Sequence, residues 1–188
     1  MNNQQKTAVV LELLDKLQAH GSWCGETHLQ KSVYLLQEVT RVPMEFNFRL
    51  YIHGPFSFDF HERLSEFRAD GLIVVVVQPY PYGPSFASTK SSEVMRRRFP
   101  KTLKTYELAT DFVAEAIGAK GVAELEQLST AYLVTTQSPQ RASAARRAVM
   151  LRKMKPHIDE GSAINAVNQC DELIERWKRF ASPVTDCS

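Results

Sequence analysis

Residues 46–77 read FNFRLYIHGPFSFDFHERLSEFRADGLIVVVV, and most of the predicted architecture follows from them. Residues 46–52 alternate apolar with polar side chains, which is typical of a β-strand with one buried face. Gly54 and Pro55 are expected to end this strand and to fix a tight exit into the next element. We therefore interpret these two residues as structural.

A helix is predicted directly after this turn. Its N-terminal cap is either Ser57 or Asp59, and Glu62 lies in the capping-box position relative to Asp59. Gly71 is expected to end the helix, because glycine enters left-handed backbone space without a Cβ clash. Three residues at helical spacing form the expected buried face: Phe60, Leu64 and Phe67.

An antiparallel hairpin is predicted after this helix. Residues 72–77 form an apolar, mostly β-branched run that is too short to span a membrane. Residues 79–84 read PYPYGP and indicate a turn that leads into a second strand over 85–89. Helix, glycine, strand, turn and strand together are typical of the second half of a winged helix.

Two further helices are predicted before this unit. The first is expected to end at His20 and Gly21, and the second runs from a capping box of Thr27 with Gln30 to about Arg41. Apolar residues recur at helical spacing along the first helix: Val9, Val10, Leu13, Leu14 and Leu17. The second helix has a similar stripe: Leu29, Val33, Leu36 and Val39.

The C-terminal half is predicted to be helical. Residues 90–100 are polar and basic and indicate a connector, and the helical pattern begins at Lys101. One later helix is expected to begin at Ser138 and Pro139, and the last extends over about 162–180. The predicted class is α+β and mainly helical. A winged-helix-like unit with a small antiparallel sheet covers 1–90, and C-terminal helices over 91–188 pack on it in one compact domain.

Composition is that of an ordinary folded protein, with 188 residues, 44% hydrophobic and 23% charged. The polar N-terminus and the lack of any run of about 18 apolar residues predict a cytoplasmic protein without a membrane partner. The net charge is +2, but residues 96–104 hold five basic side chains and residues 141–155 hold six, with no acid in either segment. The molecule is therefore expected to be electrostatically two-sided.

Two motifs resemble the bacterial YwgA-like and Panacea-domain proteins, which include SocA-like proteins. Residues 25–37 read GETHLQKSVYLLQ, and residues 51–57 read YIHGPFS before a helix that ends in RADGL at 68–72. In that family a "lxKLvYll" helix precedes a "y.yGP.s" element. The resemblance covers residues 7–90, and this chain has His53 where the family usually has tyrosine.

The resemblance implies an antitoxin-like or regulatory protein of toxin–antitoxin and phage-defence systems. Members neutralise toxins by direct protein contact, as the C-terminal domain of DarG-type antitoxins does with DNA-modifying ADP-ribosyltransferases. The family carries no established catalytic residues. We therefore expect a non-enzymatic protein whose partner is a toxin or another effector protein.

The candidate contacts for that partner lie in two places. Lys31 and Tyr34 are off the apolar stripe of their helix and are expected to line a cleft near His53. The alternative is that Lys31 snorkels and Tyr34 is half-buried. The wing supplies three aromatic candidates, which either dock a protein or cover the sheet: Tyr80, Tyr82 and Phe86.

The alternative function is a winged-helix transcriptional regulator that binds DNA. In that case Arg63 and Arg68 on the third helix would meet phosphate, together with a downstream cluster: Arg96, Arg97 and Arg98. Glu62 and Glu66 on the same helix oppose this interpretation, because carboxylates repel a polyanion. A small-molecule-sensing regulator would combine both functions.

Enzymatic motifs are not indicated. The five histidines have no metal-ligand spacing, and the three cysteines form neither a CxxC pair nor a disulfide framework. Ser57, His53 and Asp59 are the residue types of a catalytic triad, but they lie within one short turn and no GxSxG elbow accompanies them. The sequence also lacks a phosphate-binding glycine loop, so we predict no enzyme activity, metal or cofactor.

Overall fold

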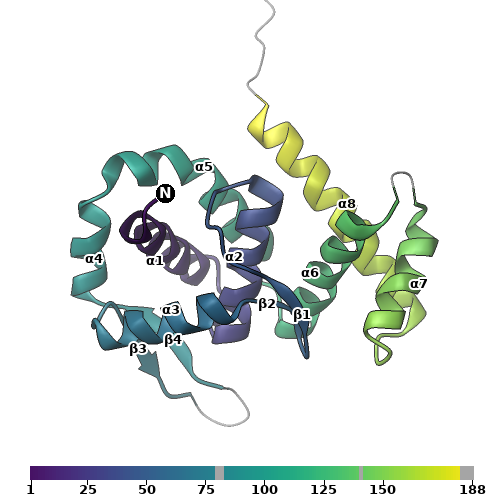
Figure 1. Ribbon diagram of the computed structural model, residues 1–188, viewed down its shortest axis with the longest axis horizontal. Helices are drawn as coiled ribbons and strands as arrows, with labels where there is room; N and C mark the ends of the chain where they lie inside the picture. The colour runs from purple at the N-terminus through teal and green to yellow at the C-terminus, as the bar shows by residue number, and fades with distance from the viewer. Residues whose placement is uncertain (79–82, 140–141, 183–188) are drawn as a thin grey trace, which may run out of the picture.

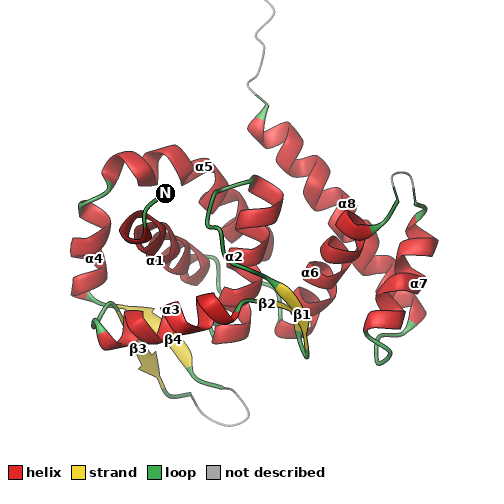
Figure 2. Ribbon diagram, viewed as in Figure 1, coloured by secondary structure: helices red, strands yellow, loops and turns green. Residues whose placement is uncertain are grey.

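A computed structural model describes residues 1–78, 83–139 and 142–182, and over these it forms eight helices and four short strands (Figure 1). The N-terminal elements are α1 (Asn3–Ala19), α2 (Glu26–Thr40), β1 (Arg49–Tyr51), β2 (Gly54–Phe56), α3 (Phe58–Ala69), β3 (Ile73–Val76) and β4 (Ser85–Ser88). The C-terminal elements are α4 (Lys90–Arg97), α5 (Pro100–Ile117), α6 (Val122–Gln137), α7 (Ala144–Met154) and α8 (Glu160–Ala181). The prediction of a mainly helical chain with a small antiparallel sheet is confirmed, although the described strands form two separate hairpins (Figure 2).

The helices are arranged around α1 and α2. Helices α4 and α5 both pack against α1, and α2 lies between α5 and α6 (Figure 1). Helices α6, α7 and α8 pack on one another, while the β1–β2 hairpin rests on α2 and α6. One hydrophobic core contains residues from every helix except α4, so the segments 1–90 and 91–188 share their interior.

Several helix ends follow the local sequence signals. The Ser57 hydroxyl accepts a hydrogen bond from the backbone N–H of Phe60, so Ser57 is the N-cap of α3. Gly71 follows α3 with φ +65°, and the N–H of Leu72 donates to the carbonyl of Phe67 at 2.8 Å. This is the bond pattern of a glycine-terminated helix. Gly21 has φ +85° just beyond α1, at the position where that helix was predicted to end.

The strand predicted over 46–52 is present only in part, and its predicted buried face is wrong. Strand β1 covers only three residues and pairs with β2, with Arg49 opposite Phe56 and Tyr51 opposite Gly54. Gly54 has φ +85°, which lets the chain reverse after Ile52 and His53, so the predicted end of the strand is instead its partner strand. Phe46 lies in a segment without regular secondary structure, where the Gln37 side chain holds its backbone with two hydrogen bonds, of 2.8 and 3.0 Å.

Three other local predictions are wrong. Gln30 does not cap α2; its buried amide accepts a bond from the N–H of Ser57 and donates to the carbonyl of the same residue, both at 3.0 Å. The expected connector over 90–100 begins with α4, because Thr89 provides an N-cap through its hydroxyl. Helix α7 begins at Ala144, after a cap at Ser143, and not at Ser138.

Candidate interaction site

Two buried lysines anchor the inner side of the β1–β2 hairpin. The Lys31 ammonium group donates to the carbonyl oxygen of Pro55 at 2.7 Å. The Lys155 ammonium group donates to the carbonyl oxygens of Tyr51, at 3.0 Å, and Ile52. Lys31 is 1% exposed and Lys155 is 4% exposed, so both charges have left water to bind the backbone of the hairpin.

Glu126 on α6 balances this buried charge. Its Oε1 lies 2.8 Å from Nζ of Lys155, and its Oε2 lies 3.4 Å from Nδ1 of His53 at the hairpin turn. Burial favours a raised pKa for the Glu126 carboxyl, but the hydrogen bonds and charges of Lys155 and His53 lower that pKa overall. Burial lowers the pKa of Lys31 to about 8, although the negative charge of Glu126 acts in the opposite direction.

Gly54 brings the hairpin close to α6. A Cβ atom at this position would lie 2.9 Å from Oγ1 of Thr130 and 3.3 Å from Oγ of Ser129. Glycine is therefore required twice, once for its positive φ and once for the close approach of the two backbones. Together with the lysine contacts, this packing fixes the hairpin to the α2–α6 surface.

Large apolar side chains are exposed on the hairpin and at the start of α3. Leu50, Tyr51, Ile52 and Phe58 are 41, 49, 65 and 52% exposed. Phe56 is partly buried, and its ring centroid lies 5.6 Å from that of Tyr51 and 5.1 Å from that of Phe58. We call these five residues the hairpin patch: Leu50, Tyr51, Ile52, Phe56 and Phe58. Single exposed apolar residues are common on proteins, but several large ones on one hairpin and the adjoining helix start, with three aromatic rings in contact, are typical of an interaction site.

The predicted partner contacts are not brought together on this surface. Lys31 and His53 belong to the same hairpin cluster, but Lys31 is buried and His53 is exposed. Tyr34 is buried, its ring lies 5.1 Å from that of Phe48, and burial raises the pKa of its hydroxyl. Phe86 is buried in the core, whereas Tyr80 and Tyr82 lie outside the described residues.

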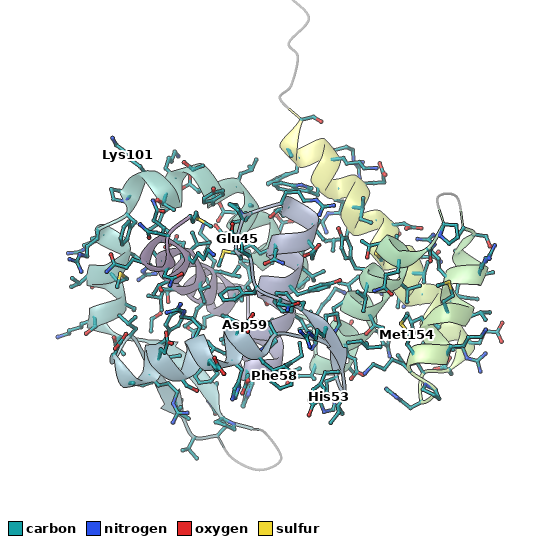
Figure 3. All side chains as sticks on the ribbon, in the orientation of Figure 1. Glu45, His53, Phe58, Asp59, Lys101 and Met154 are labelled. Carbon is teal, nitrogen blue, oxygen red and sulfur yellow. The ribbon has the colours of Figure 1, made fainter. Side chains whose placement is uncertain are left out.

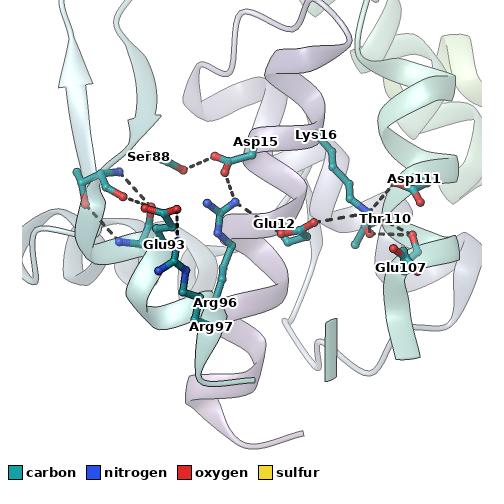
Figure 4. Close-up of polar contacts among 12 residues, drawn as sticks. Glu12, Asp15, Lys16, Ser88, Glu93, Arg96, Arg97, Glu107, Thr110 and Asp111 are labelled. Atoms are coloured by element: carbon teal, nitrogen blue, oxygen red, sulfur yellow. Dashed lines mark hydrogen bonds and ion pairs between the residues drawn. The ribbon is translucent and has the colours of Figure 1, made fainter. Parts of the chain in front are cut away.

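Three of the five arginines expected to contact DNA are paired with carboxylates of the protein itself. The Arg96 guanidinium turns toward α1, where it pairs with Asp15 and lies 3.5 Å from Glu12 (Figure 4). Arg97 pairs with Glu93 at 2.8 Å. Arg63 on α3 pairs with Glu66, and Arg68 and Arg98 are exposed on different helices or helix ends.

The hairpin patch was missed by sequence reasoning, which assigned Leu50 and Ile52 to a buried strand face. A signal was present nonetheless. Phe56, Phe58 and Phe60 occupy every second position around the N-cap Ser57. Only Phe60 belongs to the apolar stripe of α3. The rings of Phe56 and Phe58 therefore had to lie on a surface other than the buried face of α3.

No known family model and no curated protein sequence matches this chain. The resemblance to Panacea-domain proteins stays a prediction from the motifs around Lys31 and Gly54. Among the described residues, none of the helices combines the length and apolarity that crossing a membrane requires.

Proposed function

We propose that this chain is a non-enzymatic, antitoxin-like regulator of the cytoplasm that binds a toxin or another effector protein through the hairpin patch. The observation that carries the proposal is the exposure of four large apolar side chains on one anchored hairpin and the start of α3. The motif resemblance supports the antitoxin part of the proposal.

The anchoring of the hairpin favours binding. Aromatic residues such as Tyr51 and Phe58 supply large contact area, and they are enriched among the residues that dominate interface energies. Lys31 and Lys155 hold the hairpin backbone from behind, so little conformational freedom remains to be lost when a partner docks. A preformed apolar surface of this kind suits protein recognition.

The proposed function includes a winged-helix-like unit that binds protein and not DNA. The order α3, β3, β4 is that of the second half of a winged helix. Helix α3 presents exposed carboxylates, among them Asp59 and Glu62, and Arg96 is engaged by α1. DNA binding through these elements would need phosphate contacts that this charge arrangement disfavours.

The test is affinity capture from nuclease-treated lysate of the native host. The tagged wild-type protein is compared with an Ile52→Ser, Phe58→Ser double variant and with a control, Val94→Ser with Leu108→Ser. The control changes residues that are also exposed, 61 and 46%, but on α4 and α5. We expect the wild type and the control to capture one protein in stoichiometric amount, and the patch variant to lose it. This captured protein should arrest growth when it is expressed alone.

Equal capture by all three proteins would contradict the assignment of the surface. If no protein is retained and untreated lysate yields nucleic acid that is lost at raised salt, the DNA-binding alternative replaces the proposal.

A further inference from the structure

We infer that the partner presents a basic amphipathic segment, whose apolar side chain docks on the hairpin patch while a neighbouring lysine or arginine binds the carboxylates of α3. This inference rests on the proposed function and adds the chemistry of the partner. It follows from the charges that border the patch.

Helix α3 carries a row of exposed acids. Residues spaced by three or four lie on the same side of a helix, and four acids have that spacing: Asp59, Glu62, Glu66 and Asp70. Phe58 precedes Glu62 by four residues, so the apolar patch continues directly into the acidic row. In the view of Figure 3, Glu45, Asp59, Phe58 and His53 lie in this order from the middle of the molecule toward its lower edge.

Part of this negative charge is uncompensated. Glu66 pairs with Arg63, and Glu45 pairs with Lys6. Asp59, Glu62 and Asp70 have no ion-pair partner within residues 1–78, 83–139 and 142–182. These carboxylates are exposed, so they keep their hydration in the free protein and attract a cationic partner.

A groove beside the row fits a long cationic side chain. It has a volume of about 240 Å³ and lies between α3, the start of α1 and residues 44–46. Its apolar lining comes from Met44, Phe46 and Phe67. Its charged lining consists of four carboxylates and two cations. Because Lys6 and Arg63 pair with Glu45 and Glu66, the carboxylates of Asp59 and Glu62 are left without a counter-charge in the groove. Lysine and arginine have an aliphatic stem and a charged head, and such a lining matches both parts.

Other occupants fit this face less well. In a symmetric dimer through the patch, the acidic row of one copy would approach the acidic row of the other, and like charges across an interface are repulsive. Nucleic acid would meet the same repulsion from Asp59 and Glu62. A segment that carries both apolar and basic side chains satisfies both parts of the surface.

The test is selection of a displayed random-peptide library on the immobilised full-length protein, with the Phe58→Ser variant used for counter-selection. We expect the retained peptides to combine a large apolar residue with lysine or arginine and to have net positive charge. For one such peptide, Asp59→Asn with Glu62→Gln should raise the dissociation constant roughly five- to tenfold at low salt. Glu172→Gln with Glu175→Gln, at two exposed positions of α8, is the matched control and should leave the dissociation constant unchanged.

The possible outcomes separate the two proposals. Phe58-dependent peptides that are neutral or acidic, or that bind the charge variant unchanged, would overturn the inference and leave the binding surface standing. A library that yields no Phe58-dependent peptide would count against both. Sedimentation of the free protein completes the test, because a dimer dissociated by Phe58→Ser would identify a second copy as the occupant and overturn the inference.

Discussion

The ammonium group of Lys155 and the carboxylate of Glu126 lie 2.8 Å apart, and both side chains are less than a tenth exposed. Lys155 also donates to the carbonyl oxygens of Tyr51 and Ile52, so the turn between α7 and α8 is tied to the β1–β2 hairpin. A buried ion pair stabilises a fold little more than a well-packed apolar pair would. Removing only one of its two charges is strongly destabilising, because the other charge stays buried. The position of the hairpin patch therefore depends on helices far away in the sequence.

Removing one partner of this pair should be strongly destabilising. We expect Glu126→Gln to lower the free energy of unfolding by about 3 kcal/mol, because the Lys155 ammonium would stay buried without its counter-charge. Adding Lys155→Met to this variant should restore part of the loss. Urea denaturation of the two single variants and the double variant measures the coupling, and strictly additive losses would contradict it.

The Glu126 carboxylate should also make the free energy of unfolding depend on pH in the acidic range. The pKa of Glu126 is lowered in the folded protein, so the unfolded chain takes up its proton at higher pH than the folded chain does. The contribution of Glu126 is complete above its unfolded pKa, and it is lost as the pH falls through the lowered folded pKa. Urea denaturation between about pH 7 and pH 3 should show a shallower acid decline for Glu126→Gln than for wild type. Parallel curves would contradict this origin.

Lys31 should act in the alkaline range, where its contribution to stability also rises with pH. Its pKa is about 8 in the folded protein against 10.5 in the unfolded chain. Between these values the unfolded chain binds more protons, so the contribution of Lys31 to stability rises with pH, by up to about 3 kcal/mol. The free energy of unfolding of wild type relative to Lys31→Met should therefore increase from pH 8 to pH 10.5. If the difference in free energy of unfolding between wild type and Lys31→Met stayed constant over this pH range, burial of the Lys31 ammonium group would not be destabilising.

The close approach at Gly54 can be tested against a glycine with the same positive φ. Gly21 also has φ +85°, but a Cβ atom there would meet no atom within 4 Å. We expect Gly21→Ala to cost about 1 kcal/mol from backbone strain, and Gly54→Ala to cost about 2–3 kcal/mol because the methyl group also clashes with Thr130. Thermal or urea unfolding measures both. In a Thr130→Ala background the excess cost at Gly54 should shrink, and an unchanged excess would rule out the clash.

Elements whose signals lie within a few residues could be predicted from the sequence. The cap at Ser57, the stop at Gly71 and the apolar stripe of α1 depend on neighbours one or two helical turns away. The contacts within the β1–β2 hairpin are also between residues close in sequence, but the alternation of apolar residues predicted one longer strand. Its true register depends on the left-handed conformation of Gly54, which the sequence allows without requiring.

The candidate site was predictable only in part, because its contacts are distant along the chain. Lys31 was expected to line a cleft near His53, and in the structure its buried ammonium group bonds to the carbonyl of Pro55. Glu126 and Lys155, which complete the cluster, carry no motif. Burial of Lys31 also could not be inferred, since a lysine off the apolar stripe is ordinarily exposed. The exposed patch arises because these buried groups hold the inner face of the hairpin.

The measurement that tests the central claim most directly is calorimetric titration of the captured partner protein with wild type, Phe58→Ala and Leu108→Ala. Phe58 and Leu108 are comparably exposed, at 52 and 46%, but only Phe58 belongs to the hairpin patch. We predict that Phe58→Ala raises the dissociation constant by at least about tenfold and that Leu108→Ala changes it by less than about twofold. Equal dissociation constants for wild type and Phe58→Ala would contradict binding through the patch.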